Sequence, residues 1–374
     1  MNEYRFADME SMDIEESFML QALKIAQLGK WKVMPNPLVG CVIEKDGEII
    51  AKGWHDHIGG LHAEQMAIAD AEKKGISLQG ATAYITLEPC NHFGRTPPCT
   101  EALLWAGIKK VVIGALDPNP TVRGGGLKML QNEKFEVKTG VLEESCEKQM
   151  ETFMYWCKNR RPIVTLKAAT DINGRIDVDK DKPARRFSSD ESLQIAHELR
   201  ANSMAILVGV NTVIRDNPEL TVRGLDIGPR EPPIRVVIDP NNRIPTNCHL
   251  MESEVAPTLL IQNKHFDSKK DKKHVERVVI SESKKIEVSK IVDMLGDRKI
   301  QSLLVEGGKD TWIRFLESGL VNRAHLCVSN LELEGDVGER FDCNYLLENK
   351  LKKIATRKIN NDEITIWEKY NSLS

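Results

Sequence analysis

The sequence predicts an α/β protein with two domains. The chain has 374 residues, more than one typical core holds and about right for two domains of ordinary size. Helix-like and strand-like segments alternate from Ile14 to about Gly140, and a second alternating pattern begins at Pro162. Alternation of this kind is typical of layered α/β folds. We therefore expect domains over residues 1–145 and 162–374, joined by a connecting helix over residues 146–161.

The first pattern begins with an amphipathic helix. Hydrophobic residues recur at helical spacing from Ile14 onward, and Gly29 is a typical helix C-cap. The next two strand-like runs flank Asp46-Gly47, a dipeptide that favours a tight hairpin turn. The remaining expected elements are a helix from about His62, a strand over 81–87, a helix over about 100–107 and a strand over 109–115.

The second pattern opens with the strand-like run PIVTLKAA. The strand-like runs that follow are AILVGV, IRVVID, TLLIQ, RVVI, SLLVEGG and the closing EITIWEK. A basic stretch, KHFDSKKDKKHVER, separates two of them. It lacks the interleaved aromatic residues of a nucleic-acid-binding segment, so it is typical of a solvated loop.

Composition excludes several classes of protein. Hydrophobic residues make up 41% and charged residues 29%, as in soluble globular proteins. The formal net charge of −3 gives no general attraction to nucleic acid or anionic lipid. The acidic N-terminus lacks the apolar core of a signal peptide, and no apolar run approaches the ~20 residues that cross a bilayer. Eight cysteines without a secretory signal are typical of free thiols or metal ligands, so we expect a cytoplasmic location.

One constellation of residues points to zinc. Zinc prefers nitrogen and thiolate ligands, and a catalytic site uses three protein ligands and leaves the fourth position to water. His62, Cys90 and Cys99 supply such a set. Glu64 stands two residues after the histidine, at the start of a helix, where a carboxylate can carry a proton from water to a leaving ammonia. This H-x-E…P-C-x-x-C arrangement is typical of zinc deaminases that act on nucleobases.

The loop between the two cysteines departs from that arrangement. Eight residues, NHFGRTPP, separate them instead of two, and this stiff polar loop suits a charged substrate. Alone, His62 would be a helix-surface residue and each cysteine a buried hydrophobic residue; together with Glu64 they favour a metal site. His55, His57 and His92 are rival ligands. Of these, His55 follows Gly-Trp at the end of a strand and suits a substrate contact better.

With their flanking residues, these motifs resemble the bifunctional deaminase–reductase family of riboflavin biosynthesis. The matching motifs of the first half are PNPLVG, HAE, TLEPC, GRTPPC and DPNP. Those of the second half are Leu166-Lys167, LVGVNTV, NPELTVR and VEGG. The match extends from about residue 15 to about residue 330, which is most of the chain.

The resemblance implies a cytidine-deaminase-like α/β/α layered domain followed by a dihydrofolate-reductase-like α/β domain. The cofactors it implies are Zn2+ and NADPH. The first domain would hydrolytically deaminate 2,5-diamino-6-(5-phosphoribosylamino)pyrimidin-4-one, and the second would reduce the ribosyl arm of the product to ribityl. The partner is then a small phosphorylated pyrimidine, with no nucleic acid and no membrane, and the chain is expected to form a homodimer or homotetramer.

The resemblance also implies further site residues. In the first domain, the residues expected to contact substrate are Asn36, His55 and Arg95. In the second domain, they are Asp216, Arg223 and Glu306. The residues expected to bind cofactor are Lys167, Gly209, Thr212, Gly307 and Gly308. The last two glycines lie between a strand and a helix, where backbone N–H groups can approach a phosphate.

The sequence departs from the family mainly in its second half. Asp171-Ile172-Asn173-Gly174 stands where the family reads close to S-L-D-G, and Arg186 lies in the region of an expected tryptophan. Leu193 stands where an arginine is expected, and Asn91, in the first half, replaces a serine. These changes keep a second reading open, a deaminase whose degenerate second domain serves structure or dimerisation.

Two other readings belong to different classes. A nucleic-acid-editing deaminase needs a basic channel and stacking aromatic residues, but only 5% of the residues are aromatic and no basic arm lies near the zinc motif. An interaction protein with a vestigial zinc site would not depend on Glu64 for any reaction.

Overall fold

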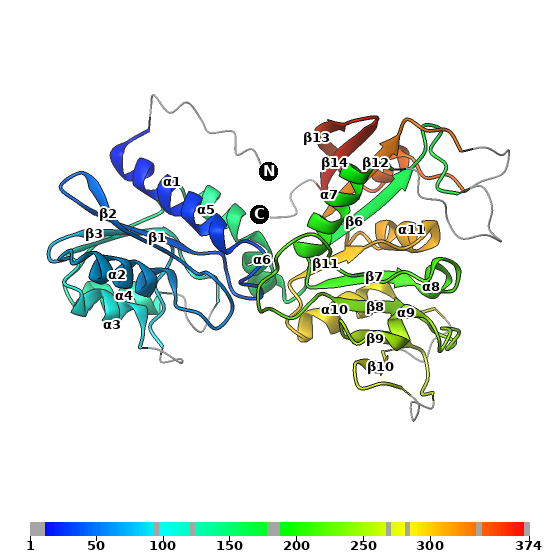
Figure 1. The fold of residues 1–374 in the computed structure, drawn as a ribbon, viewed down its shortest axis with the longest axis horizontal. Coiled ribbons are helices and arrows are strands. Elements are labelled where there is room, and N and C mark those ends of the chain that lie inside the picture. Colours follow the sequence, from blue (N-terminus) through cyan, green and yellow to red (C-terminus); the bar gives the residue numbers. More distant parts are fainter. Residues whose placement is uncertain are drawn as a thin grey trace. The chain divides into compact units, whose positions relative to one another are not determined.

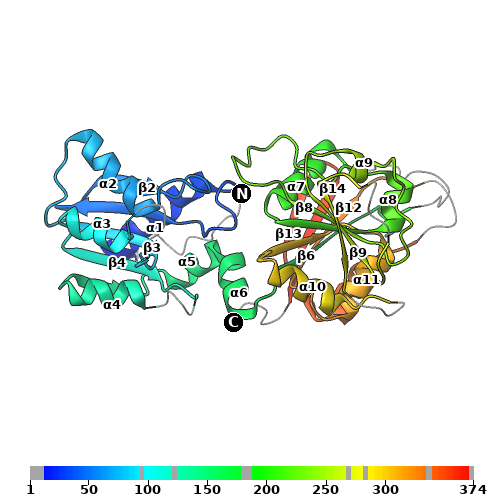
Figure 2. The ribbon, with the colours of Figure 1, turned by 90° about the horizontal axis from the view of Figure 1, so that it is seen from below.

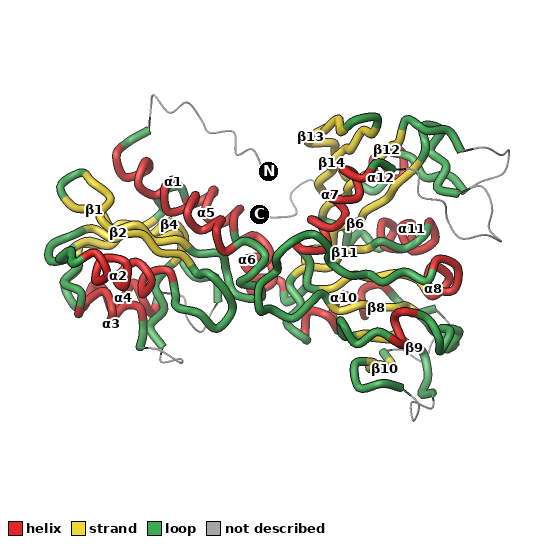
Figure 3. The backbone as a smooth tube through the Cα atoms, viewed as in Figure 1, coloured by secondary structure: helices red, strands yellow, loops and turns green. Residues whose placement is uncertain are grey.

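The structure is a computed structural model that describes residues 12–92, 97–119, 124–177, 188–266, 271–280, 285–333 and 339–369. It divides into two compact units, each with its own sheet (Figures 1 and 3). Unit 1 comprises Met1–Lys158 and Ile227–Arg230; unit 2 comprises Asn159–Asp226 and Glu231–Ser374. None of the described helices is both long and apolar enough to span a membrane.

Unit 1 contains a five-stranded sheet in the order β2-β1-β3-β4-β5. Its strands are β1 (Gly40–Lys45), β2 (Glu48–Trp54), β3 (Thr82–Leu87), β4 (Lys110–Ala115) and β5 (Glu136–Thr139). Strand β1 is antiparallel to β2 and β3, whereas β3, β4 and β5 are mutually parallel. Asp46 and Gly47 turn the β1–β2 hairpin with φ of 54° and 84°, which confirms the expected tight turn.

Helices cover both faces of this sheet. They are α1 (Ile14–Ala26), followed by the 3-10 turn η1 (Gln27–Gly29), α2 (Ala63–Lys74), α3 (Cys99–Trp105), α4 (Gly125–Asn132), α5 (Glu143–Gln149) and α6 (Glu151–Asn159). Strand residues alternate between faces, so Ile43 packs with α2, α3 and α4, whereas Val42 packs with α1 and α5. In Figure 1, helices α2, α3 and α4 lie below this sheet and helices α1 and α5 lie above it. The predicted α/β/α layering is confirmed. The segment expected to be one connecting helix contains two, α5 and α6.

Unit 2 contains a nine-stranded sheet in the order β10-β9-β8-β7-β11-β6-β12-β14-β13. Its strands are β6 (Ile163–Thr170), β7 (Ala205–Gly209), β8 (Ile234–Ile238), β9 (Thr258–Gln262), β10 (Val275–Val279), β11 (Ser302–Val305), β12 (Arg323–Ser329), β13 (Leu351–Ile359) and β14 (Asp362–Lys369). The pairings from β10 to β12 are parallel, and those of β14 with β12 and β13 are antiparallel. The carboxyl ends of β7, β8, β9 and β11 therefore share one edge.

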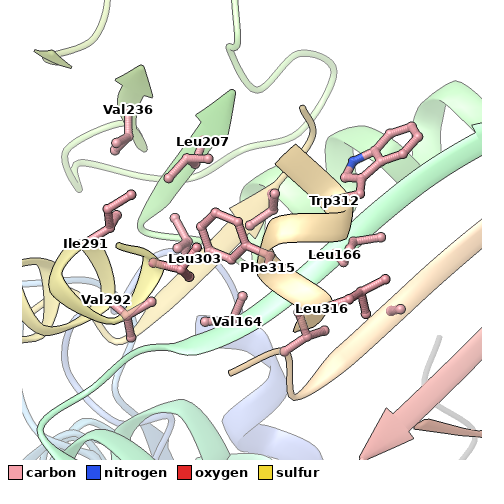
Figure 4. Packing of buried hydrophobic residues seen from close by; sticks show 14 of the residues in the cluster. Val164, Leu166, Leu207, Val236, Ile291, Val292, Leu303, Trp312, Phe315 and Leu316 are labelled. Carbon is pink, nitrogen blue, oxygen red and sulfur yellow. The ribbon is translucent and has the colours of Figure 1, made fainter. Parts of the chain in front are cut away.

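The helices of unit 2 pack on both faces of this sheet. They are α7 (Asp190–Ala201), α8 (Val210–Asp216), α9 (His249–Glu252), α10 (Val288–Asp297), α11 (Lys309–Glu317) and α12 (Cys343–Glu348). Helices α10 and α11 lie on one face and α8 and α9 on the other (Figure 2). On the first face, Trp312 and Phe315 of α11 and Ile291 of α10 pack against apolar side chains of β6, β7 and β11 (Figure 4).

Three strands were not predicted from the sequence: β5, β12 and β13. Strand β13 is an edge strand with mostly exposed residues and several lysines, so it lacks the hydrophobic alternation of a half-buried strand. Strand β5 is short and largely exposed. A strand with so little alternation of buried and exposed residues cannot be distinguished from a loop in the sequence.

Candidate active sites

Helix α2 begins at the candidate metal site. His62 is the N-cap residue, in extended conformation, and Glu64 lies in the first helical turn with only 4% of its surface exposed. The helix can approach β2 this closely because Gly53 has no side chain. A Cβ on Gly53 would lie 2.2 Å from the carbonyl oxygen of Ala63.

The two cysteines reach the same point from separate segments. Cys90 follows β3, and Cys99 is the first residue of α3. The Nδ1 atom of His62 lies 3.3 Å from Cys99 Sγ and 3.5 Å from Cys90 Sγ, and the three candidate ligand atoms all lie within 4.8 Å of one another. A tetrahedral zinc ion with ordinary bond lengths separates its nitrogen and sulfur ligands by about 3.6 Å. The arrangement therefore fits zinc.

The charge states at the site suit metal binding and proton transfer. The pKa of Cys90 is lowered to about 4, first by a hydrogen bond from Cys99 and then by His62, so one thiolate is present at neutral pH. The pKa of Glu64 is raised to about 7, first because burial disfavours its charge and second because the Cys90 thiolate lies nearby.

His55 and Asn36 lie beside the metal site. The rings of His55 and His62 are 5.8 Å apart, and the Asn36 amide Nδ2 donates to His55 Nε2 over 3.0 Å. His55 Nδ1 donates to the carbonyl oxygen of Leu61 over 3.0 Å. Both ring nitrogens of His55 are thus engaged, and burial lowers the pKa of this histidine, so it is neutral.

Three further sets of residues near this site remain: the rival histidines, Arg95 and Glu88. Among the described residues, the rival histidines His55, His57 and His92 do not belong to the group of possible metal ligands. Arg95, which the sequence assigns to the substrate, lies outside the described residues. Glu88 was not predicted, although it is buried and accepts hydrogen bonds two residues before Cys90. Its place in the TLEPC motif was the available signal.

In unit 2, Glu306 stands at the carboxyl end of β11 in a cluster of cations. Arg200 of α7 donates to both of its carboxylate oxygens, over 2.7 Å each, and Lys167 of β6 acts on it electrostatically. Burial works against the charge of Glu306, but Arg200 and then Lys167 lower its pKa. Arg200 was not predicted as a site residue, because it reads as the basic last turn of an amphipathic helix.

The segment that carries Arg223 is held against this cluster. Arg200 Nη1 donates to the carbonyl oxygen of Thr221, and the Arg223 backbone N–H donates to His197 Nδ1 over 3.2 Å. The guanidinium of Arg223 itself pairs with Glu219 at the surface. Asp216 lies at the end of α8, and Arg215 Nε is 3.9 Å from its carboxylate.

The predicted cofactor glycines lie next to one another at the shared edge of the sheet. A Cβ on Gly307 would be 2.7 Å from the Cβ of Thr311, and one on Gly209 would be 3.0 Å from the Oγ1 of the same threonine. A Cβ on Gly308 would be 3.8 Å from the Oγ1 of Thr212. The turns after β7 and β11 thus pack around the Thr311 side chain of α11, which leaves no room for a side chain at Gly307. The N-terminus of α11, at this edge of the sheet, suits the phosphates of a dinucleotide.

The residues of unit 2 that differ from the family pattern lie in different environments. Asp171 is fully buried, and Asn173 Nδ2 donates to Glu332 over 2.9 Å, so both residues have structural partners. Leu193 is half-buried on α7, and Arg186 lies outside the described residues.

Comparison with known proteins identifies both units. Residues 12–115 match the family model of the cytidine and deoxycytidylate deaminase zinc-binding region, and residues 162–362 match that of the RibD C-terminal domain. The chain is 36% identical to the riboflavin biosynthesis protein RibD of Aquifex aeolicus (strain VF5), over 96% of this chain and 99% of the relative. It is also 36% identical to the RibD of Escherichia coli (strain K12), over 82% and 85% of the two chains.

Similar solved structures lead to the same family assignment. A diaminohydroxyphosphoribosylaminopyrimidine deaminase/5-amino-6-(5-phosphoribosylamino)uracil reductase from Thermotoga maritima matches with a TM-score of 0.82 and 35% identity, over 96% of this chain and 99% of that one. RibD from Acinetobacter baumannii matches with a TM-score of 0.83 and 30% identity, over 96% and 99%. These matches favour neither a degenerate second domain nor a nucleic-acid-editing enzyme. The chain belongs to the RibD family of riboflavin biosynthesis, with a zinc-dependent deaminase and an NADPH-dependent reductase in one polypeptide.

Proposed function

We propose that His62, Cys90 and Cys99 bind the zinc ion of the deaminase and that Glu64 moves its protons. The substrate of this site is a 2,5-diaminopyrimidinone with a phosphoribosylamino arm, the compound class in the name of the Thermotoga maritima relative. One observation carries the proposal: the three candidate ligand atoms lie within 4.8 Å of one another beside a carboxylate that is 4% exposed.

Zinc held by these residues would make a water molecule acidic and so supply the nucleophile of the reaction. Glu64 would accept a proton from the water as the carbon–oxygen bond forms, and would deliver it to the amino group, which leaves as ammonia when the carbon–nitrogen bond breaks. A pKa near neutrality suits both transfers, because the carboxylate must take up and release a proton in each cycle. Burial of Glu64 keeps bulk water from competing for that proton.

Asn36 and His55 orient the pyrimidine. The contact of His55 Nδ1 with Leu61 fixes the histidine tautomer, and the contact of Nε2 with Asn36 then fixes the amide, so the pair presents a set pattern of donors and acceptors. We assign the arm of the substrate to Arg95, whose guanidinium suits a phosphate.

In the reductase, Lys167, Gly209, Thr212, Gly307 and Gly308 are assigned to NADPH. The N-terminus of α11 suits the cofactor phosphates, and NADPH would supply the hydride for reduction of the ribosyl arm.

The residues assigned to the reductase substrate are Asp216, Arg223 and Glu306. The Arg200–Glu306 pair keeps a carboxylate charged at the edge of the sheet, where it can accept hydrogen bonds from the hydroxyl groups of a sugar. We place the boundary of the two catalytic domains in the segment over residues 146–161, as the sequence predicts.

One assay separates this proposal from a deaminase with a structural second domain. Purified chain is mixed with deaminated substrate and NADPH, and the absorbance of reduced nicotinamide is followed, while zinc per chain is measured on the same sample. We expect NADPH consumption and about one zinc per chain. A Cys90→Ala variant is expected to lose zinc and deamination, and a Cys146→Ala variant, which removes a buried thiol on the opposite face of the sheet, is expected to keep both. Zinc retained by Cys90→Ala contradicts the ligand assignment.

We further propose a cytoplasmic homodimer or homotetramer that does not bind nucleic acid. Ile172 and Leu331, both more than half exposed, are joined through their backbones, and adjacent apolar side chains of this kind are often covered by assembly. Sedimentation at micromolar concentration that gives only monomer contradicts the assembly. Tight, salt-sensitive binding of single-stranded nucleic acid would contradict the proposal that the protein does not bind nucleic acid.

A further inference from the structure

Glu88 is a buried carboxylate that the proposed mechanism does not use. It lies between β3 and Cys90 with 4% of its surface exposed. Its Oε2 accepts backbone N–H groups of Asp117 over 3.2 Å and of Gly124 over 3.0 Å, and its Oε1 accepts that of Leu127 over 3.0 Å. One side chain thus joins three backbone positions that lie 29 to 39 residues further along the chain.

Glu88 replaces a missing helix cap. Helix α4 starts after Gly124, which has no side chain, and no residue of the helix caps its first turn. The N–H groups at the start of a helix need acceptors, and a negative charge there is stabilised by the helix dipole. Glu88 supplies both from the segment that follows β3, so the position of α4 depends on it.

The start of α4 also packs tightly against the segment that carries Cys90. A Cβ on Gly126 would lie 2.0 Å from the carbonyl oxygen of Pro89. Asn91 bridges the same parts: its Nδ2 donates to the carbonyl oxygen of Gly125 over 3.4 Å, and its Oδ1 accepts from the Thr100 hydroxyl over 2.9 Å. Thr100 directly follows Cys99, so both cysteine segments are tied to α4.

The turn that Glu88 holds lies beside the metal site. Asp117 is buried, with its Oδ1 accepting the N–H of Asn119 over 2.8 Å, and its carboxyl interacts electrostatically with Cys90 and His92. The turn over residues 117–119 therefore lies close to the segment that carries Cys90.

We propose that Glu88 is a positioning residue of the deaminase, which holds the turn over residues 117–119 and the start of α4 in register with Cys90 and so shapes the substrate pocket. The inference rests on the assignment of Cys90 to zinc. Glu88 itself contacts neither substrate nor metal; its effect passes through the backbone that it holds.

A Glu88→Gln variant tests this. Glutamine keeps the size but turns an NH2 group toward N–H donors, so at least one hydrogen bond is lost. We expect KM for deamination to rise by about 10- to 100-fold, the size of a lost hydrogen bond to a charged group, with a smaller fall in kcat. Amide exchange at Gly124 and Leu127 is expected to accelerate by at least about tenfold, with zinc content unchanged.

The chain offers two controls. The reductase of the same polypeptide should keep its activity, and Glu133→Gln, an exposed carboxylate at the other end of α4, should change neither KM nor amide exchange. Unchanged KM in Glu88→Gln overturns the inference, as does loss of zinc or of reductase activity, which would make Glu88 a folding residue. Retained zinc in Cys90→Ala contradicts the proposed function instead, and amide exchange still decides whether Glu88 holds α4.

Discussion

Glu64 shows how burial of one residue sets its chemistry. An exposed glutamate is ionised at neutral pH, and its low pKa makes it a weak base for taking a proton from water. Placed in the first turn of α2 with 4% exposure, Glu64 has a pKa of about 7. The dominant cause is the loss of water around the carboxylate, and the neighbouring Cys90 adds to it.

We predict that Glu64→Gln retains zinc and loses deamination by roughly two to four orders of magnitude, the usual contribution of a general acid–base group. The amide has the shape of the carboxylate but cannot exchange protons. Zinc per chain and the rate of deamination are measured on the same preparation, with reductase activity as the internal reference. Zinc loss in this variant would show that Glu64 is a ligand.

Asp171 illustrates a departure from the family that serves structure. It is fully buried and accepts the backbone N–H groups of Asn173, Arg175 and Leu333 as well as Arg175 Nε. These bonds join the turn after β6 to the turn after β12. Burial opposes the charge of Asp171, yet the hydrogen bonds from Leu333 and Arg175 lower its pKa.

We predict that Asp171→Asn lowers the free energy of unfolding of unit 2 by about 2–4 kcal/mol at pH 7, because the buried Arg175 loses its 2.7 Å ion pair with Asp171 and its contact with the exposed Glu332 is longer, at 3.3 Å. The pKa of Asp171 is depressed in the folded state. Its stabilising contribution is therefore complete above about pH 4, the pKa in an unfolded chain, and is lost as pH falls further. Denaturant unfolding at pH 7 and pH 3 should show this difference shrink. The exposed Asp297→Asn is the control, and an equal loss there contradicts the prediction.

At the scale of elements, the contact of α2 with β2 places two functional side chains. Gly53 faces the first turns of α2, where a Cβ would meet Ala63 O at 2.2 Å and Ala67 N at 2.3 Å. Backbone atoms cannot yield as side chains can, so a larger residue must displace the helix. His62 and Glu64 would move with it.

We predict that Gly53→Ala destabilises unit 1 by about 1–3 kcal/mol and weakens both zinc binding and deamination. Gly125→Ala is the matched control, since a Cβ there meets nothing within 4 Å. Thermal unfolding, zinc content and both activities are compared for the two variants. If Gly53→Ala leaves zinc affinity unchanged, the close packing of α2 does not position His62.

At the scale of the molecule, two sheets with separate hydrophobic cores carry separate chemistry. The candidate zinc ligands lie in unit 1, whereas the predicted reductase residues lie in unit 2. A core that is complete within each unit allows one activity to be removed without the other.

We predict that removal of zinc by a chelator abolishes deamination and leaves NADPH-dependent reduction of the deaminated substrate within about twofold of its initial rate. Zinc added back should restore deamination, and thermal unfolding should shift only for the transition assigned to unit 1. Parallel loss of both activities would mean that the reductase depends on the metal.

Local sequence was sufficient for much of this protein. Amphipathic periodicity, the Asp46-Gly47 turn and the apolar strand runs predicted most elements, because these signals act over a few residues. The zinc site formed by His62, Glu64, Cys90 and Cys99 could also be recognised in the sequence, since zinc chemistry restricts residue types and spacing. The edge strand β13 was not predicted, because its sequence shows little alternation of hydrophobic and polar residues. The division of the connection into two helices was not predicted either, because a break inside a helical pattern depends on packing.

Side-chain partners far apart in sequence were decided only by the tertiary structure. Arg200 pairs with Glu306 across 106 residues, and Glu88 caps α4 from the segment that follows β3. No periodicity encodes such pairs, because strand order and register bring them together. Residue types and their spacing were enough to identify the side chains that can bind zinc and move protons. Only the fold decided that three ligand atoms lie within 4.8 Å of one another and that Glu64 is buried beside them, since burial and convergence are properties of packing.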